Sequence, residues 1–251
     1  VVDDPGDLVV VLGRALALQQ RGHRDELEGG QPPRAGRRPE VRVRGCPVGI
    51  DIPGFIAKIS GKDYRGAYDV ITETNLLAAV CGRVCPQESQ CEGVCTVGET
   101  LEPVAIGRLE RFVGDRAIAE GWSNVPYSEP NGLSVGIVGA GPAGMACAAD
   151  TTKAGCEVTV YEAFHQAGGV LKYGIPDFRL PNEVVDAEIE NLRKLGVQFV
   201  CNTLVGRLFT IAEMIDEMGH DAVFIGTGAG YPSMLGIPGD FQIKTMTGRP
   251  I

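Results

Sequence analysis

Three features are scarce in this sequence: long apolar runs, histidine and closely spaced cysteine pairs. No apolar run among the 251 residues approaches the about 18 residues of a membrane span. The stretch Leu8–Leu12 is short and follows acidic residues, which disfavours a secretory signal peptide. The histidines His23, His165 and His220 are isolated and form no catalytic or metal-binding pattern. We therefore expect a cytoplasmic protein that spans no membrane, whose eight cysteines are thiols or metal ligands rather than disulfides.

Lysine is absent from the first 44 residues, which instead contain eight arginines; the first lysine is Lys58. Residues 31–39 show neither helical nor strand periodicity. We expect residues 1–44 to be a disordered basic tail or an aberrant segment, such as one read out of frame. The whole chain carries a formal net charge of −9, which argues against nucleic acid as a partner.

Residues 45–121 have the periodicity of helices joined by short loops. One helix is predicted over residues 52–59, and a second follows Asp63, a residue suited to cap it. A third helix is predicted over residues 103–119, and the cysteine-rich segment falls in the connection before it. Residues 122–132 contain two prolines and an Asn-Gly pair, so we interpret them as a linker.

From residue 133 onward, short apolar strands alternate with helices. Strands are predicted at 134–138, 157–161, 197–200 and 221–225, and helices at 142–154, 182–195 and 211–218. Repeated β-α-β units indicate a parallel, doubly wound sheet. The expected fold class is therefore α/β, with a Rossmann-like sheet over residues 133–251 that follows a helical domain over residues 45–121.

A glycine-rich turn, Gly139-Ala-Gly-Pro-Ala-Gly144, follows the first of these strands and opens a helix. In that setting Gly139 permits the tight turn, Gly141 lets the backbone approach a pyrophosphate, and Gly144 allows close packing of helix on strand. Glu162, just after the next strand, is placed to bond a ribose hydroxyl, and its charge disfavours a 2′-phosphate. The turn therefore predicts FAD or NAD rather than NADP at this site.

Two further segments are candidates for contact with the same ligand. The loop over residues 168–181 is long and aperiodic, which fits a segment that covers a ligand, although a plain surface loop is the alternative. The segment Gly226-Thr-Gly-Ala-Gly230 ends a strand at the same edge of the sheet as the turn.

Four cysteines lie within fifteen residues of the helical part, and a fifth lies upstream. Cys81, Cys85, Cys91 and Cys95 surround a proline and two glycines, and Cys46 precedes another proline. Four thiolates in a small loop can bind zinc, but zinc ligands more often come as Cys-x-x-Cys pairs. Iron–sulfur clusters accept looser spacings, and the spacing favours such a cluster while zinc stays open. The remaining thiols, Cys147, Cys156 and Cys201, are interpreted as small buried hydrophobes.

Several motifs occur together over about residues 43–239: Cys46-Pro-Val-Gly-Ile-Asp-Ile-Pro53, Cys81-Gly-Arg-Val-Cys-Pro86, Cys91-Glu92, Pro103–Arg111, the glycine turn, Gly169–Pro181 and Gly226-Thr-Gly-Ala229. This combination resembles the glutamate synthase small (beta) subunit family, which includes flavin subunits of NADPH-ferredoxin transhydrogenases. The N-terminal part of dihydropyrimidine dehydrogenase is similar. The resemblance implies a helical domain with two 4Fe-4S clusters, followed by an FAD domain with an inserted NADPH domain. NADPH would reduce FAD, and the clusters would pass electrons to a larger glutamate synthase-type or ferredoxin-type partner subunit.

By position within these motifs, the resemblance implies Cys46, Cys85, Cys91 and Glu110 as ligands of one cluster and Cys95 as a ligand of the other. An exposed helix carboxylate is the alternative for Glu110, and Cys81 is expected not to be a ligand. The implied cofactor-binding residues are Gly139, Gly141, Pro142, Ala143, Gly144, Glu162, Gly169, Leu171, Arg179, Thr227 and Gly228. No catalytic residue is assigned.

The sequence departs from the family pattern at both ends. Three cysteines that precede the position of Cys46 in the family are missing, so we expect the second cluster not to assemble. Gly236–Asp240 still matches, but the NADPH turn and the last FAD segment are absent. We therefore expect a fragment of an oxidoreductase, inactive alone and weak in FAD binding. The alternatives are a non-catalytic protein that binds zinc and a nucleotide, and an inactive truncation product.

Overall fold

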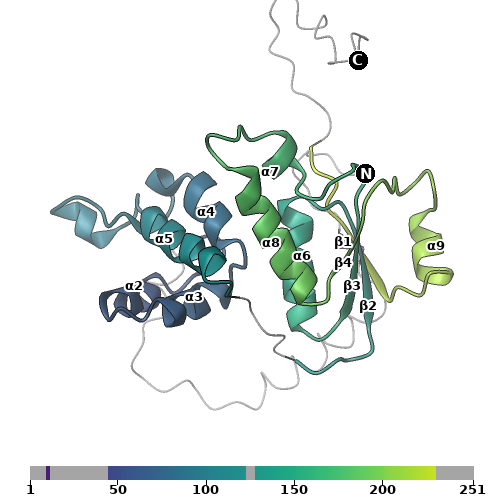
Figure 1. Ribbon diagram of the computed structural model, residues 1–251, viewed down its shortest axis with the longest axis horizontal. Helices are drawn as coiled ribbons and strands as arrows, with labels where there is room; N and C mark the ends of the chain where they lie inside the picture. Colours follow the sequence, from purple (N-terminus) through teal and green to yellow (C-terminus); the bar gives the residue numbers. More distant parts are fainter. Residues whose placement is uncertain (1–9, 12–44, 123–127, 230–251) are drawn as a thin grey trace, which may run out of the picture.

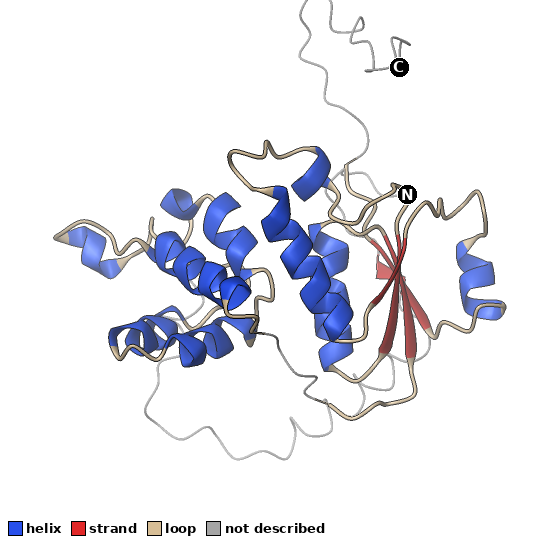
Figure 2. Cartoon of the chain, in the orientation of Figure 1, coloured by secondary structure: helices blue, strands red, loops and turns tan. Residues whose placement is uncertain are grey.

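The computed structural model describes residues 10–11, 45–122 and 128–229, which form a helical part beside an α/β part (Figures 1 and 2). Apart from Val10–Val11, the segment 1–44 lies outside the described residues, as do Gly230 and the Gly236–Asp240 motif. The predictions made for those positions are therefore not addressed by the structure. Among the described helices, none is both long and apolar enough to cross a membrane.

The helical part consists of α2 (Ile52–Ser60), α3 (Tyr64–Thr72), α4 (Ala78–Val84) and α5 (Ile106–Ala119). Asp51 and Asp63 cap the first two helices, because their carboxylates accept hydrogen bonds from backbone N–H groups of the first turn. The apolar faces of α2, α3 and α5 meet around Phe55, Ile71 and Val113, all essentially without exposure. These three helices agree with the prediction, although α5 begins at Ile106 rather than at residue 103.

Helix α4 differs from the prediction, which placed the whole cysteine run in a connection between helices. The structure places Cys81 inside α4 and Cys85 at its C-terminal cap, followed by short 3-10 turns at Gln87–Ser89 and Thr96–Glu99. The N-cap residue of this seven-residue helix is Leu77, whose apolar side chain cannot accept a hydrogen bond. Its N-terminus is instead capped from the α/β part, where Glu188 accepts a hydrogen bond from Ala79 N at 3.3 Å. A cap 109 residues away in sequence leaves no local pattern to detect.

The α/β part contains a sheet in the order β1-β5-β2-β3-β4. Strands β2 (Ser134–Val138), β3 (Glu157–Tyr161), β4 (Gln198–Val200) and β5 (Ala222–Ile225) are parallel to their neighbours, which confirms the predicted parallel α/β fold. The short strand β1 (Val10–Val11) adds antiparallel to β5 at one edge. Taken in chain order, the parallel strands run 3-2-1-4, the order of a dinucleotide-binding sheet.

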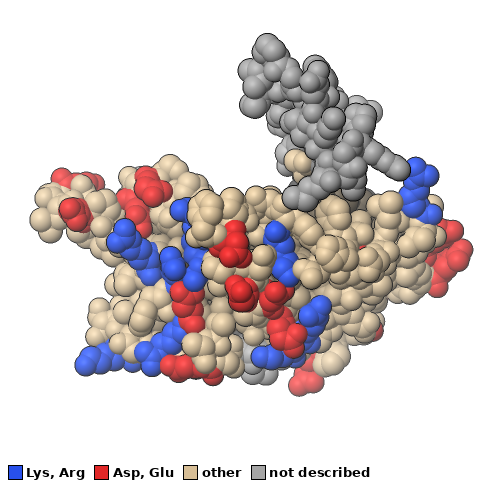
Figure 3. Space-filling view, turned by 45° about the horizontal axis from the view of Figure 1, so that its top comes forward, with Lys and Arg blue, Asp and Glu red and all other residues tan. Residues whose placement is uncertain are grey.

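Helices cover both faces of this sheet (Figure 1). Helices α6 (Pro142–Lys153) and α8 (Asn182–Lys194) pack on one face, and α9 (Ile211–Asp216) packs on the other. Successive side chains of β2 point to opposite faces of the sheet. Ile137 packs in the core with α6 and α8, whereas Val138 packs in the core with α9. On the face shown in Figure 3, acidic and basic side chains intermingle across the middle of the molecule.

Helix α4 belongs to both parts of the molecule. Leu77 and Val80 are buried in the core formed by α6, α8 and the sheet, whereas Ala78 is buried among α3 and α5. The helix also contacts α5 closely, and both α4 and α5 contact α8 (Figure 1). The two parts are therefore joined through a buried interface that contains the cysteine-bearing helix.

Candidate functional site

The glycine-rich turn lies at the point where the strand order of the sheet reverses. The turn follows β2, which lies between β3 and β5, and in parallel strands the carboxyl ends share one edge. Glu162 after β3 and Gly226 after β5 therefore flank Gly139. Backbone hydrogen bonds fix this arrangement, from Gly139 N to Tyr161 O and from Gly226 N to Val138 O, both at 2.8 Å. Ligands of such sheets bind in the crevice at this position.

The turn has the geometry that the glycine pattern predicts. Gly139 has a φ of +99°, and a Cβ there would collide with the carbonyl oxygen of Gly226. Gly141 caps α6, whose first turn contains Pro142, the exposed Ala143 and the buried Gly144. No side chain caps the N-terminus of this twelve-residue helix, and helix N-termini with free N–H groups are suited to bind phosphate.

Glu162 is buried and bonded to the turn itself. One carboxylate oxygen accepts from Ala140 N at 2.8 Å, and the other accepts from Phe164 N at 2.9 Å. These two bonds hold the carboxylate beside the turn, where a ribose would follow a bound pyrophosphate. Each carboxylate oxygen can accept more than one hydrogen bond, so the site still has capacity for ribose hydroxyls.

The loop after β3 returns to the glycine turn. Gly169, at the N-terminal cap of the short helix α7 (Val170–Tyr173), has a φ of +51°. A Cβ on Gly169 would lie 2.7 Å from the Cα of Gly141, whereas only Gly169 lies within 4 Å of the Cβ position of Gly141. The two backbones are therefore in direct contact, with no side chain between them. This glycine cradle presents bare backbone, which is what close approach to a pyrophosphate requires.

The other residues implied for the cofactor occupy different environments. Leu171 is buried in the core with α6 and α8, so its side chain supports the loop. Arg179 is exposed in the segment between α7 and α8. Thr227 and Gly228 are exposed after β5, on the same edge of the sheet as the turn. Of these residues, Thr227 and Gly228 share the sheet edge of the glycine turn, whereas Leu171 supports the loop from below its surface.

The thiols and the carboxylate implied for a cluster come from separate elements of the helical part. Cys46 precedes α2, Cys85 ends α4, Cys91 lies between the two 3-10 turns, and Glu110 lies in α5. These three cysteines, like Cys95, are free and partly buried. Cys91 interacts electrostatically with Cys46 and Glu110, and Glu110 does so with Cys85. The structure thus brings these four side chains into one neighbourhood.

Glu110 is buried rather than an exposed helix carboxylate, with 7% of its surface accessible. Burial, with a smaller contribution from Cys85, raises the pKa of Glu110 to about 8. One of its oxygens accepts from Asn75 Nδ2 at 2.8 Å, and the other has no hydrogen bond to any described residue. A buried carboxylate with an unused oxygen, which interacts electrostatically with Cys85 and Cys91, has the chemistry expected of a metal ligand.

Cys81 and Cys85 are neighbours one helical turn apart, and Cys85 N donates to Cys81 O at 3.1 Å. The neighbouring Cys81 thiol lowers the pKa of Cys85 to about 7, which favours the thiolate that binds metals. The same interaction, reinforced by burial, raises the pKa of Cys81 above its ordinary value. Burial raises the pKa of Cys91 to about 11, and nearby carboxylates add to this effect.

Glu92 connects the loop that contains Cys91 to α5, the helix that contains Glu110. Its carboxylate accepts a hydrogen bond from Gly107 N at 3.0 Å, in the first turn of α5. This contact ties the loop of Cys91 to α5 one turn before Glu110. Sequence reasoning missed Glu92 and Asn75 as parts of the site, although Glu92 directly follows a cysteine in a quoted motif.

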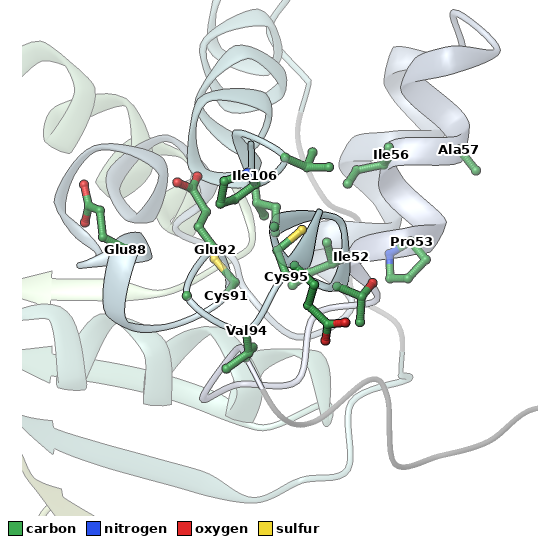
Figure 4. Close-up of a pocket in the computed structure, with 17 residues that line it drawn as sticks. Ile52, Pro53, Ile56, Ala57, Glu88, Cys91, Glu92, Val94, Cys95 and Ile106 are labelled. Carbon is green, nitrogen blue, oxygen red and sulfur yellow. The ribbon is translucent and has the colours of Figure 1, made fainter. Parts of the chain in front are cut away.

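Cys95 lies four residues after Cys91 on the same loop. With Cys91 it lines a cavity of about 1120 Å³ between its loop and α2, beside Ile52, Ile56 and Ile106 (Figure 4). Backbone N–H groups, chiefly that of Val104, lower the pKa of the Cys95 thiol. Cys95 is thus a favourable thiolate ligand whose neighbours in this cavity are largely apolar.

A single metal ion and an iron–sulfur cluster need different spacings of their ligands. A tetrahedral zinc site requires four donors around one atom. In an iron–sulfur cluster each ligand binds a different iron atom, so the ligands stand farther apart. Within residues 45–122 and 128–229, no three His, Cys, Asp or Glu side chains are close enough to hold one ion. The electrostatic interactions among Cys46, Cys85, Cys91 and Glu110 are compatible with the looser spacing of a cluster.

Comparisons with known proteins agree with both halves of this site. The family model described as "Dihydroprymidine dehydrogenase domain II, 4Fe-4S cluster" matches residues 38–122, and the model of pyridine nucleotide-disulphide oxidoreductases matches residues 133–249.

Glutamate synthase (NADH) of Saccharomyces cerevisiae is 40% identical over 196 residues, which are 78% of this chain and 9% of that protein. The glutamate synthase (NADPH) small chain of Escherichia coli K12 is 38% identical over 192 residues, 76% of this chain and 40% of that protein. Subunit PreT of the NAD-dependent dihydropyrimidine dehydrogenase of the same strain is 40% identical over 192 residues, 74% of this chain and 46% of that protein. The chain spans less than half the length of each of these relatives.

Proposed function

Because the chain belongs to the family of the glutamate synthase small chains, we propose that it is part of an NAD(P)H-dependent oxidoreductase that moves electrons between FAD and a 4Fe-4S cluster. Bound FAD accepts a hydride from NAD(P)H, and the cluster carries the electrons onward one at a time. The resemblance favours NADPH, whereas the relatives are named for NADPH, NADH or NAD. We therefore propose NAD(P)H as the electron donor of the whole protein rather than of this chain alone.

The observation that carries this proposal is the position of α4 between the two halves of the site. Cys85 ends α4, and the same helix packs through Leu77 and Val80 against the core of the FAD-type sheet. Helix α8, which contacts α4, follows directly after the loop that contains Gly169 and Arg179. A short, packed path between two redox centres is what electron transfer within one protein needs.

On the flavin side, the residues of the chain bind and orient. The N-terminus of α6 and the cradle of Gly141 and Gly169 would hold a pyrophosphate. Glu162 would accept hydrogen bonds from the adjoining ribose. These roles support FAD as the resident dinucleotide of the first turn.

On the cluster side, we propose Cys46, Cys85, Cys91 and Glu110 as the ligands. The three thiols are partly buried and Glu110 is buried, so the site lies below the surface of the helical part. Cys95 is proposed as a ligand of a second cluster, for which it is the only thiol of the helical part left over besides Cys81. We expect that second cluster not to form on these residues alone.

The acceptor of the electrons is proposed to be a larger partner subunit of the glutamate synthase or ferredoxin type. We further propose that these 251 residues alone do not oxidise NADPH, since residues 145–251 contain no second glycine turn of the Gly-x-Gly-x-x-Gly kind. Reduction of the flavin then needs residues supplied by the rest of the protein.

Anaerobic purification tests this proposal at the metal site. We expect a brown protein with iron and acid-labile sulfide in equal amounts, and loss of both in Cys85→Ser and in Cys91→Ser. The matched control is Cys147→Ser, a partly buried thiol of α6 outside the site, which should retain full iron. Zinc without iron would support the alternative of a zinc- and nucleotide-binding protein. Unchanged iron in both ligand variants would overturn the ligand assignment.

A further inference from the structure

Asn75 lies between α3 and α4, at the centre of the cluster side of the site. Only 8% of its surface is accessible, and both ends of its side-chain amide are engaged. No motif of the sequence analysis included it. The question is whether Asn75 only supports the fold or also organises the metal site.

The two ends of the amide contact different parts of the site. The nitrogen donates to Glu110 Oε1 at 2.8 Å in a fully buried hydrogen bond across 35 residues. The oxygen accepts from Leu77 N at 3.0 Å and from the Cys81 thiol at 3.6 Å. An amide is suited to this, because one end only donates and the other only accepts. Cys81 in turn lies one helical turn before Cys85, whose backbone N–H donates to Cys81 O at 3.1 Å.

These contacts form a continuous chain from Glu110 through Asn75 and Cys81 to Cys85. The first and last members are proposed ligands on different helices, α5 and α4, and the middle members are not ligands. Removal of the Asn75 amide or of the Cys81 thiol would interrupt this chain between the two ligands. Outer partners of this kind fix the orientation of ligands in metal sites.

We propose that Asn75 is a positioning residue that holds Glu110 and, through Cys81, Cys85 in register for a 4Fe-4S cluster. This inference rests on the proposed function. It assigns Cys81 a defined role as a thiol that supports a ligand without being one.

Asn131 shows what a purely structural asparagine does in the same chain. Its Oδ1 accepts from the N–H of Leu133, two residues on, as that of Asn75 does from Leu77. Its Nδ2 donates to Ala154 O and to Cys156, far from the cluster site. Asn131 thus closes a local turn, whereas Asn75 adds a bond to a buried carboxylate of another helix.

The test compares Asn75→Asp with Asn131→Asp in the full chain, reconstituted anaerobically with ferrous iron and sulfide. Asn75→Asp keeps an oxygen for Leu77 N and Cys81 but replaces the donor to Glu110 with a second carboxylate. Retention of iron against a chelator should fall about 10- to 100-fold, the range for loss of an outer partner of a metal ligand. The electron paramagnetic resonance spectrum of the remaining reduced cluster should also change. Asn131→Asp should leave both readouts at the wild-type level.

A second variant decides the matter if Asn75→Asp does not fold. Cys81→Ala leaves Asn75 and its bond to Leu77 in place but removes the thiol that contacts Asn75 one helical turn before Cys85, and iron retention should fall about 10-fold. The double variant with Asn75→Asp and Glu110→Gln should recover part of the lost retention, because the introduced amide can donate to the introduced carboxylate. A wild-type level of iron and an unchanged spectrum in Asn75→Asp, or in Cys81→Ala where the first variant is unfolded, would overturn the inference alone. A wild-type chain that takes up no iron would overturn the proposed function and this inference with it.

Discussion

The two halves of the site are built in different ways. The flavin half is made by the backbone: a glycine turn at the end of β2, flanked by residues that follow β3 and β5. The cluster half is made by side chains, since Asn75, Glu92 and Glu188 bridge elements that are 35, 15 and 109 residues apart. A backbone-built site tolerates no added atoms at Gly139 and Gly144, whereas a side-chain-built site depends on individual hydrogen bonds. The two should therefore respond differently to substitution.

The largest effect is expected for Gly139→Ala in the backbone-built half. The φ of +99° is unfavourable for alanine, and its Cβ would collide with Gly226 O. Backbone strain and overpacking together should lower the free energy of unfolding by about 2 to 5 kcal/mol. Chemical denaturation measures this loss, and flavin titration should show no binding.

The control for this prediction is Gly132→Ala. Gly132 also has a positive φ, of +77°, but nothing lies within 4 Å of its Cβ position. Its variant should lose only the conformational part, about 1 to 2 kcal/mol. Equal losses in the two variants would contradict the view that close approach of two strand ends shapes the turn.

The same difference explains what the sequence alone could predict. The bounds of β2 and β3, the turn and the position of Glu162 follow from patterns that are local in sequence, and the structure agrees with them. Helix α4 was not predicted, because the side chain that caps its N-terminus is Glu188 of α8, far away in the sequence. The roles of Asn75 and Glu92 were missed for the same reason, since a hydrogen bond between distant side chains leaves no periodicity. Glu110 was placed by resemblance to a family, and only its burial distinguishes it from an ordinary helix carboxylate.

Glu188, at the junction of the two halves, predicts a pH dependence of stability. Burial raises its pKa from 4.5 to about 7 in the folded chain. The folded state keeps a proton that the unfolded chain releases between these values, so stability falls as the pH rises from about 4.5 to about 7. A shift of this size corresponds to about 3 kcal/mol. Glu188→Gln keeps an oxygen for Ala79 N without the titration, so its stability relative to wild type should increase over this range.

Denaturation of both proteins between pH 4.5 and pH 8 measures that difference. The matched control is Glu190→Gln on the same helix, where the carboxylate is exposed beside Arg193 at 3.5 Å. Its difference from wild type should stay nearly constant with pH. A constant difference for Glu188→Gln as well would mean that the junction between α4 and α8 does not bury this charge in solution.

The smallest effect on stability, and the sharpest test of the side-chain-built half, is expected for Glu92→Ala. Loss of the cap on Gly107 N should lower the free energy of unfolding by about 1 kcal/mol. Because that bond ties the loop of Cys91 to the helix of Glu110, iron retention should fall by a larger factor than so small a loss of stability suggests. The control is Glu88→Ala, whose carboxylate makes no hydrogen bond to the described residues and which should lose neither stability nor iron. If Glu92→Ala loses about 1 kcal/mol but keeps its iron, the ligands are held by the packing of the helices rather than by side-chain bonds, and the contrast between the two halves of the site disappears.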